Sequence, residues 1–190
     1  MSLGTCSLGL SGSGVFSLSM NSLKSSLLAL TNRLPTQFRD TLYVRAFGLF
    51  KIPLVLYISP TVVELSGKRT EIKVPLNWRT QNHLKSMYFG ALCTAADLAC
   101  GLVAVKLIYE SGRKIDFVFK DFEAQFLKRV EGDAHFVCEA GDLAEQAVQK
   151  AISTGERQNI KLPVVATVPS KMGNEPVAKF SLTLSMKLRK

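Results

Sequence analysis

A single carboxylate, Asp97, lies inside the longest apolar stretch of this chain. Residues 86–105 contain no other charged side chain. Because burial of an unpaired carboxylate is costly, such a group is neutralised, paired or used in chemistry. Partial burial raises the pKa of a carboxyl group towards the range of a general base, and a carboxylate can also attack an acyl carbon directly. Asp97 is therefore a candidate catalytic acid or base, with a buried structural ion pair as the alternative role.

The residues before Asp97 offer the other groups that acyl chemistry needs. If a helix begins near residues 87–90, its first N–H groups are free to stabilise an oxyanion. Gly90 would permit close approach of a substrate to this backbone. Gly90 and Asp97 are seven positions apart, which places them on one helix face. Asn82, in the preceding polar loop, is a candidate for orienting a water or a carbonyl, with a role in the turn as the alternative.

The spacing of these groups resembles the hotdog-fold thioesterase superfamily, and within it the phenylacetyl-CoA-thioesterase-like branch and an uncharacterised bacterial family. That branch has an Asn three residues before a Gly, a His-Gly-Gly three residues later, and an acid nine residues after the His. Asn82, Gly90 and Asp97 match the Asn, the second Gly of the pair and the acid. The departures are Lys85, Tyr88 and Phe89, where the branch has Gly, His and Gly. The resemblance covers roughly residues 55–189.

The resemblance implies an α+β hotdog fold, in which a curved antiparallel sheet wraps around a long central helix. It also implies a homodimer or dimer of dimers, with the acid of one subunit facing the helix N-terminus of the other. The implied ligand is an acyl-CoA thioester, with CoA as part of the substrate and no separate cofactor or metal. The catalytic candidates are Asp97, Asn82 and Gly90. The substrate-binding candidates are His83, Tyr88, Phe89 and Arg157, of which Arg157 would contact the nucleotide end of CoA.

Two other functions compete with a thioesterase. The departures at Lys85, Tyr88 and Phe89 motivate a non-catalytic hotdog dimer that binds acyl-CoA or a fatty acid. Residues 36–58, which place Arg45 and Lys51 among many apolar side chains, motivate peripheral attachment to a membrane.

Composition narrows the class of protein further. With 190 residues and 47% hydrophobic content, the chain is long enough for one domain with a full core. A net charge of +9 favours anionic partners. Nucleic-acid binding would rest on charge alone, so we do not expect it. The four Cys form no zinc-binding pattern and favour a reducing, cytoplasmic compartment.

The expected elements alternate between helices and strands. We expect a flexible extension over residues 1–21 and one domain over residues 22–190, beginning with helices at 22–33 and 36–50. Alternating apolar residues predict a hairpin of strands 61–65 and 70–76. A buried helix then ends near residue 105, and strand 116–130 pairs with strand 134–139. A short helix over 142–152 and strands 160–168 and 177–188 complete the order. Residues 86–105 have the length of a membrane span, but the central Asp97 and the many small residues favour a helix enclosed by protein.

Overall fold

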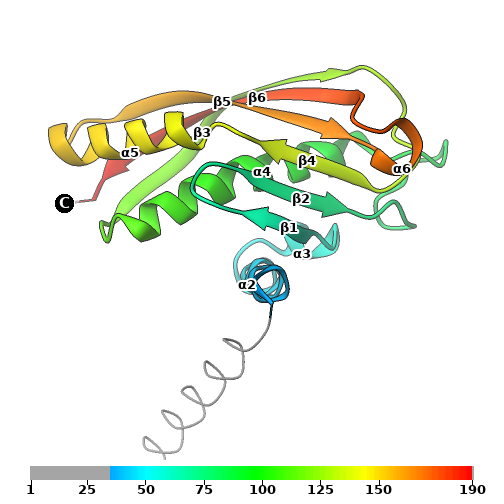
Figure 1. Cartoon of the computed structure of the whole chain (residues 1–190), viewed down its shortest axis with the longest axis horizontal. Helices are drawn as coiled ribbons and strands as arrows, with labels where there is room; N and C mark the ends of the chain where they lie inside the picture. The colour runs from blue at the N-terminus through cyan, green and yellow to red at the C-terminus, as the bar shows by residue number, and fades with distance from the viewer. Residues whose placement is uncertain (1–34, 190) are drawn as a thin grey trace, which may run out of the picture.

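Six antiparallel strands form one curved sheet (Figure 1). The computed structural model describes residues 35–189, so the predicted extension over residues 1–21 and the predicted helix 22–33 lie outside the described part. The order of strands in the sheet is β1-β2-β4-β5-β6-β3. Their bounds are β1 Thr61–Leu65, β2 Thr70–Val74, β3 Ile115–Phe126, β4 Ala134–Cys138, β5 Gln158–Thr167 and β6 Pro176–Leu188.

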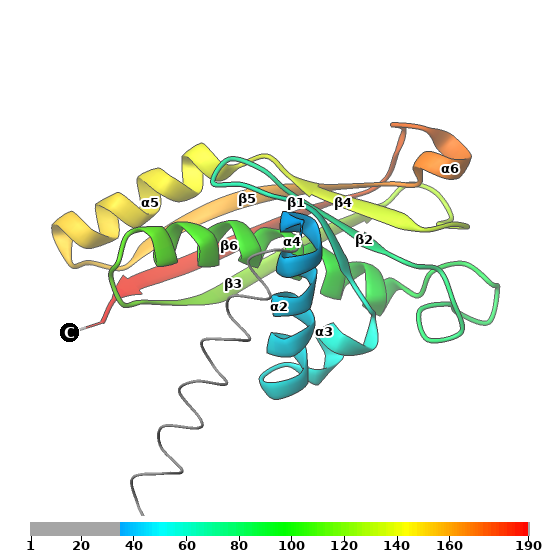
Figure 2. The same ribbon diagram turned by 60° about the horizontal axis from the view of Figure 1, so that its bottom comes forward.

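One long helix, α4 (Phe89–Glu110), runs along one face of this sheet, as Figures 1 and 2 show. The helices α2 (Thr36–Phe50) and α3 (Pro53–Tyr57) pack on each other beside β1. At the opposite end, α5 (Gly141–Thr154) packs against α4 and β5, and the short α6 (Pro169–Met172) precedes β6. The predicted helix over residues 36–50 is confirmed.

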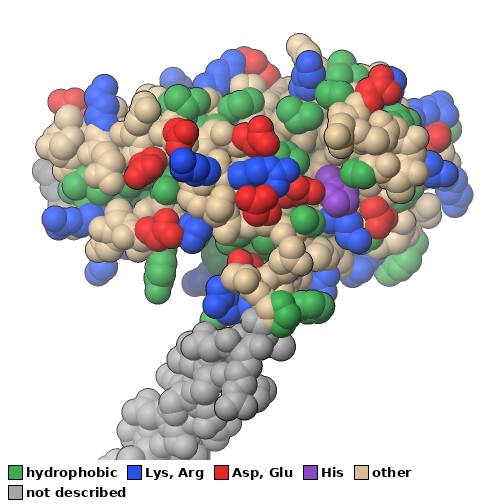
Figure 3. All heavy atoms as spheres, in the orientation of Figure 1, with side chains coloured by type: hydrophobic (Ala, Val, Ile, Leu, Met, Phe, Trp, Pro, Cys, Tyr) green, Lys and Arg blue, Asp and Glu red, His purple; other side chains and the backbone are tan. Residues whose placement is uncertain are grey.

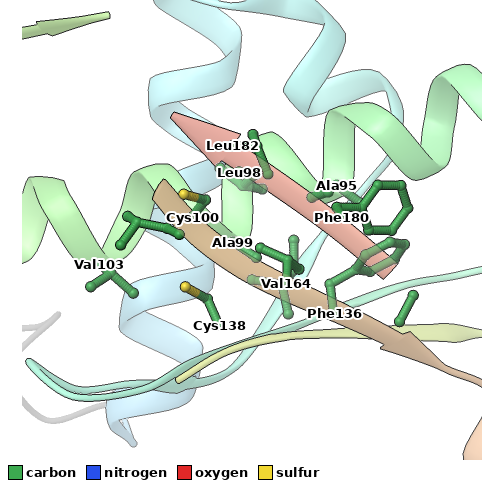
Figure 4. Packing of buried hydrophobic residues seen from close by; sticks show 14 of the residues in the cluster. Ala95, Leu98, Ala99, Cys100, Val103, Phe136, Cys138, Val164, Phe180 and Leu182 are labelled. Atoms are coloured by element: carbon green, nitrogen blue, oxygen red, sulfur yellow. The ribbon is translucent and has the colours of Figure 1, made fainter. Parts of the chain in front are cut away.

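The core is built from small side chains on the helix and large ones on the sheet (Figure 4). The face of α4 towards the sheet carries Ala95, Ala99 and Val103, all fully buried. Opposite them stand Phe136 of β4 and Leu182 of β6, which are also buried. Small helix residues let the helix axis approach the sheet closely, and the large strand residues fill the remaining space to the density of a protein interior.

The length and hydropathy of α4 would also fit a membrane span. Just over half of its most apolar window is buried inside the protein, where it packs on β2, β4, β5 and β6. We therefore interpret α4 as the core helix of the domain, as predicted. The helix continues five residues beyond the expected end, to Glu110. An ion pair between Lys106 and Glu110, one turn apart on the helix surface, stabilises this last part.

One predicted strand pairing is wrong. β3 does not pair with β4; it pairs along its whole length with β6, from Ile115 opposite Leu188 to Phe126 opposite Ala178. β4 lies between β2 and β5 instead. The short connection over residues 127–133 thus passes β6 and β5 in the strand order before the chain enters β4. β3 therefore lies at the edge of the sheet.

The face of the sheet away from α4 is polar. Arg69 of the β1–β2 turn is paired with Glu64, Glu71 and Glu139, and Glu71 also contacts His135 with 2.7 Å between Oε1 and Nδ1. Acidic and basic side chains alternate across this side of the molecule (Figure 3). These opposite charges pair with one another on the surface of the sheet.

The close contact between the β1–β2 turn and the start of α5 gives the first prediction. A Cβ on Gly141 would lie 2.2 Å from the carbonyl oxygen of Gly67, so Gly141→Ala forces two backbone segments apart. We expect a loss of about 3 kcal/mol in the free energy of unfolding, measured with urea. Gly112→Ala is the matched control, because the new Cβ meets open space there and only the left-handed φ of 63° opposes it. Its cost should be about 1 kcal/mol. Equal losses would contradict the assigned contact.

Candidate active site

A pocket of about 290 Å³ opens at the N-terminus of α4. Its lining comes from the polar loop, the first turn of α4 and the segment that follows β3. Backbone hydrogen bonds hold these three parts together: Met87 N–H donates to the carbonyl of Val130 at 2.8 Å, and Tyr88 N–H donates to that of Thr80 at 2.7 Å. The lining includes Asn82, His83, Tyr88, Phe89, Phe126 and Arg129.

The first N–H groups of α4 are available to a ligand. Ala91 and Leu92 both donate to the carbonyl of Tyr88. In the described part of the chain, the N–H groups of Phe89 and Gly90 donate to no protein acceptor. Two adjacent free donors at the positive end of a 22-residue helix are suited to a carbonyl oxygen that acquires negative charge.

Gly90 is covered by an aromatic ring. A Cβ at this position would lie 2.5 Å from Cε1 of Tyr88, so the ring of Tyr88 lies directly against the glycine. Tyr88 also meets Phe89 at 4.9 Å between ring centres, and Phe89 meets Phe126 at 6.4 Å. The mouth of the pocket is therefore aromatic, and Tyr88 and Phe89 remain about half exposed.

The side chain of Asn82 organises its own loop. Its Oδ1 accepts hydrogen bonds from the N–H groups of Leu84 (2.8 Å) and Ser86 (3.2 Å), and its Nδ2 donates to Oγ of Ser86. This closed turn forces Lys85 into the left-handed region, with φ of 61°. Asn82 lines the pocket, but the contacts observed for it are those of a turn residue that places the start of α4.

Asp97 stands half-buried on the side of α4 that the sheet does not cover. No hydrogen bond or ion pair to Asp97 occurs within residues 35–189. Burial alone raises the pKa of its carboxyl group above the usual value. The buried structural partner considered as an alternative is thus not found among the described residues.

Asp97 and the free amides do not meet within one chain. Seven residues of α-helix separate Gly90 from Asp97, a rise of roughly 10 Å. Asp97 does not line the pocket at the helix N-terminus. The residues on its side of the helix, Cys93, Thr94 and Gly101, are small and only partly covered. This surface leaves room for another chain segment to approach.

The structure brings His83, Tyr88 and Phe89 to the pocket but does not bring Arg157 there. Arg157 lies at the start of β5, where it donates from Nη1 to Oγ of Ser185 at 3.0 Å. That end of the sheet is where Gln158 pairs with Met186, whereas the pocket lies near the pairing of Phe126 with Ala178. Eight strand residues between them correspond to roughly 26 Å.

Sequence reasoning missed the contribution of the segment after β3. Phe126, Lys128 and Arg129 line the pocket, and Arg129 has no ion-pair partner in the described residues, whereas Lys128 is paired with Glu175. Their position depends on the contact between Met87 and Val130, which joins segments far apart in the sequence. The only local signal was the adjacent pair of basic residues at the end of an apolar strand.

An antiparallel sheet curved around a long apolar helix defines the hotdog fold, and solved structures share it. A Pseudomonas aeruginosa protein described as a probable thioesterase has a TM-score of 0.64 at 22% identity, covering 82% of this chain and 97% of its own. A Haemophilus influenzae thioesterase has a TM-score of 0.59 at 15% identity, covering 82% of this chain and 93% of its own. Two variants of a Staphylococcus aureus thioesterase, one with a Gln and one with a Glu replaced by Ala, have TM-scores of 0.55 at 13% identity. They cover 71% and 72% of this chain and 98% and 99% of their own.

The chain belongs to the family described as "Domain of unknown function (DUF4442)", which matches residues 41–186. No match is found among curated proteins. The predicted hotdog fold is confirmed, and the assignment to the phenylacetyl-CoA-thioesterase-like branch stays a prediction.

The strained lysine in the loop gives a second prediction. Lys85 holds the left-handed conformation at the position where the resembling family has Gly. Lys85→Gly should raise the free energy of unfolding by about 1 kcal/mol, because Gly adopts this conformation without the steric cost of a Cβ. Lys85→Ala removes the same charge but keeps the Cβ, and should give no such gain in urea or thermal unfolding. A gain of the same size in both variants would assign the effect to charge.

Proposed function

We propose that this protein is a hotdog thioesterase that hydrolyses an acyl-CoA thioester. The observation that carries the proposal is that one helix, α4, has two unused amides at its start and, two turns further on, a half-buried Asp97 without a partner in the described residues. The amides of Phe89 and Gly90 would bind the thioester carbonyl. The apolar and aromatic pocket suits an acyl or aryl group, and the unpaired Arg129 at its edge suits a phosphate of CoA.

In the proposed reaction, Asp97 acts as general base on a water molecule. The carboxylate takes a proton as the water oxygen attacks the thioester carbon, and the oxyanion forms against the N–H groups of Phe89 and Gly90. Collapse of this intermediate breaks the carbon–sulfur bond. The proton held by Asp97 then passes to the departing CoA thiolate, so the products are a carboxylic acid and free CoA.

The proposal requires a homodimer, because Asp97 and the amides of one chain are too far apart. β3 is an edge strand and exposes Val118, Phe122 and Phe126 to at least a third of their full area. Exposed apolar edge strands are sites of pairing with another chain. A two-fold arrangement in which β3 meets its own copy would bring the uncovered side of α4, with Asp97, towards the N-terminus of α4 in the partner subunit.

The Staphylococcus aureus thioesterase lends support. The Gln and the Glu replaced in its two variants are separated by as many positions in that sequence as Asn82 and Asp97 are in this one. Under the proposal, Asp97 corresponds to that Glu. Asn82 corresponds to the Gln, although its present contacts show a role in positioning the loop.

The second candidate function is a non-catalytic dimer that binds acyl-CoA or a fatty acid. The observation in its favour is the ring of Tyr88 lying on Gly90, which narrows access to the free amides. Saturable binding of acyl-CoA without release of thiol would favour this alternative over hydrolysis.

Replacement of Asp97 tests the enzyme directly. Purified protein should release free thiol from at least one member of a panel of short-, medium- and long-chain and aryl acyl-CoAs. Asp97→Ala and Asp97→Asn should lower kcat by roughly 100-fold or more, the usual contribution of a general base. Unchanged turnover in a folded Asp97→Ala protein would disprove the mechanism.

The raised pKa of Asp97 also sets the sign of two pH effects. The base must be ionised, so kcat should fall as the pH drops through the raised pKa. Because the pKa of Asp97 is raised in the folded state, protonation of Asp97 favours the folded protein. This contribution to the free energy of unfolding is fully present below the ordinary pKa of aspartate, and it is lost as the pH rises through the raised pKa. Asp97→Asn should therefore be more stable than the wild type at neutral pH, with the difference vanishing in acid.

Removal of one amide tests the oxyanion site. Tyr88 already has the extended backbone (φ −66°, ψ 137°) that favours a following proline, and Phe89 is the first helical residue, where proline is well tolerated. Phe89→Pro deletes the N–H and the ring, whereas Phe89→Ala deletes only the ring. We expect Phe89→Pro to lose a further 100-fold or so in kcat relative to Phe89→Ala.

A mixture of two inactive variants tests the shared site. If the amides and the acid come from different subunits, a dimer of one Phe89→Pro chain and one Asp97→Ala chain contains one intact site. Equal mixing after dissociation should restore about a quarter of wild-type activity, because half of the dimers are mixed and each has one working site of two. No recovery, with mixed dimers verified by mass, would place both groups in one chain's site.

A further inference from the structure

We propose that the outward surface of α2 and α3, together with Trp78, docks on a lipid bilayer that contains anionic lipid. This surface, named the α2–α3 face below, carries large apolar side chains that the domain leaves exposed. Its main members are Leu42, Leu49, Phe50, Leu54, Tyr57 and Trp78.

The first observation is that α2 is apolar on the side that faces away from the protein. Its buried contacts with the domain come from Val44 and Gly48. Leu42, Leu49 and Phe50 project from the other side, and Phe50 is 78% exposed. A solvent-facing helix side normally carries polar residues, and a contiguous apolar patch marks an interaction surface.

The second observation is an aromatic and cationic cluster beside α3. Tyr57 and Trp78 meet edge to face at 6.4 Å, and the guanidinium of Arg79 lies about 6 Å from both rings. Arg79 is fixed by a 2.6 Å hydrogen bond from Nη2 to Oγ of Ser59. Trp78 is thus held in place and yet 75% exposed. Trp and Tyr concentrate at the level of lipid headgroups, where one end of the ring is apolar and the other polar.

Charge decides between a bilayer and a second copy of this chain. α2, α3 and the two residues between them carry Arg39, Arg45 and Lys51 against Asp40, and Arg79 adds another positive charge. Lys51 has no ion-pair partner in the described residues. A two-fold contact would bring this positive surface against itself, because both copies present the same patch. Anionic lipid headgroups instead attract each exposed Lys or Arg and accept the apolar side chains beside them.

The α2–α3 face is connected through Trp78 to the loop that lines the pocket. Trp78 and Arg79 directly precede the loop of Asn82 and His83, whose Leu84 is half exposed. A protein docked through Trp78 would therefore hold the pocket entrance close to the bilayer surface. This inference rests on the exposed surface alone and does not depend on thioesterase activity.

The chain provides its own probe of this surface, because Trp78 is its only tryptophan. The full-length protein should show Trp emission typical of an exposed ring in buffer, with ready quenching by acrylamide. Vesicles of phosphatidylcholine with about 30% phosphatidylglycerol at low salt should shift the emission to shorter wavelength and protect Trp78 from acrylamide. Vesicles of phosphatidylcholine alone should give a much smaller shift and less protection of Trp78. High salt should reduce the shift that anionic vesicles produce.

In a vesicle flotation assay, variants distinguish the contribution of the apolar side chains to vesicle binding from that of the positive charges. The double variant Leu49→Gln/Phe50→Gln should bind anionic vesicles on the order of 100-fold more weakly, since it removes two apolar side chains from the contact. Lys51→Gln should bind about fivefold more weakly, the effect of one charge near the surface. Tyr109→Gln is the matched control, because Tyr109 is 86% exposed at the far end of α4 and should not affect binding. These positions are all exposed, so circular dichroism should show an unchanged fold.

Three results would overturn the proposal. No change of Trp78 emission with anionic vesicles would exclude the bilayer. Trp78 that is already protected in buffer, in a manner that depends on protein concentration, would assign the surface to a second copy of the chain. Protection in buffer that does not depend on concentration would assign it to another segment of the same chain.

Discussion

The packing of an alanine-rich helix on a sheet of large side chains is the constraint on which the rest of this structure depends. α4 is covered by the curved sheet and by α5, and one strip along the helix is left partly uncovered. The buried side uses Ala95, Ala99 and Val103 to lie close to the strands. Asp97 lies on the opposite side and has no partner in the described residues. Its partial burial raises the pKa of its carboxyl group. The same packing that stabilises the domain thus raises the pKa of a carboxyl group, and no residue in the described part of one chain pairs with it.

The start of α4 is fixed mainly by backbone groups. Two amides, those of Met87 and Tyr88, bind distant carbonyls, and the next two, those of Phe89 and Gly90, remain free. Side chains then hold the approach to the helix, with Asn82 closing the loop through Ser86. Because the donors are part of the backbone, their position survives changes of side chain in the loop. Lys85 illustrates this point, since it keeps a left-handed backbone despite the steric cost for a residue with a Cβ.

Much of this fold could be predicted from the sequence where the signals are local. Alternating apolar residues located the hairpin of β1 and β2, the apolar run located α4, and the strands predicted over residues 160–168 and 177–188 correspond to β5 and β6. The pairing of β3 could not be predicted in this way. A short connection after a strand suggested a hairpin with β4, but the apolar side chains of β6 match β3 along its full length. The contact of Arg157 with the nucleotide end of CoA stays a prediction, and the length of the sheet separates Arg157 from the amides of its own chain. The position of β3 and the distance of Arg157 from the amides both depend on pairing between strands that are far apart in the sequence, and single residues do not indicate such pairing.

The three departures from the family pattern change the walls of the pocket and leave its backbone donors in place. Where the resembling family has a His, Tyr88 places its aromatic ring against Gly90 at the start of α4. Phe89 and Phe126 extend this aromatic surface. The part of the pocket beside the free N–H groups is therefore lined by aromatic rings, which suit contact with a flat group. Under the proposed mechanism, Asp97 of the partner subunit acts as the general base, and the aromatic residues at the pocket act on which substrate enters.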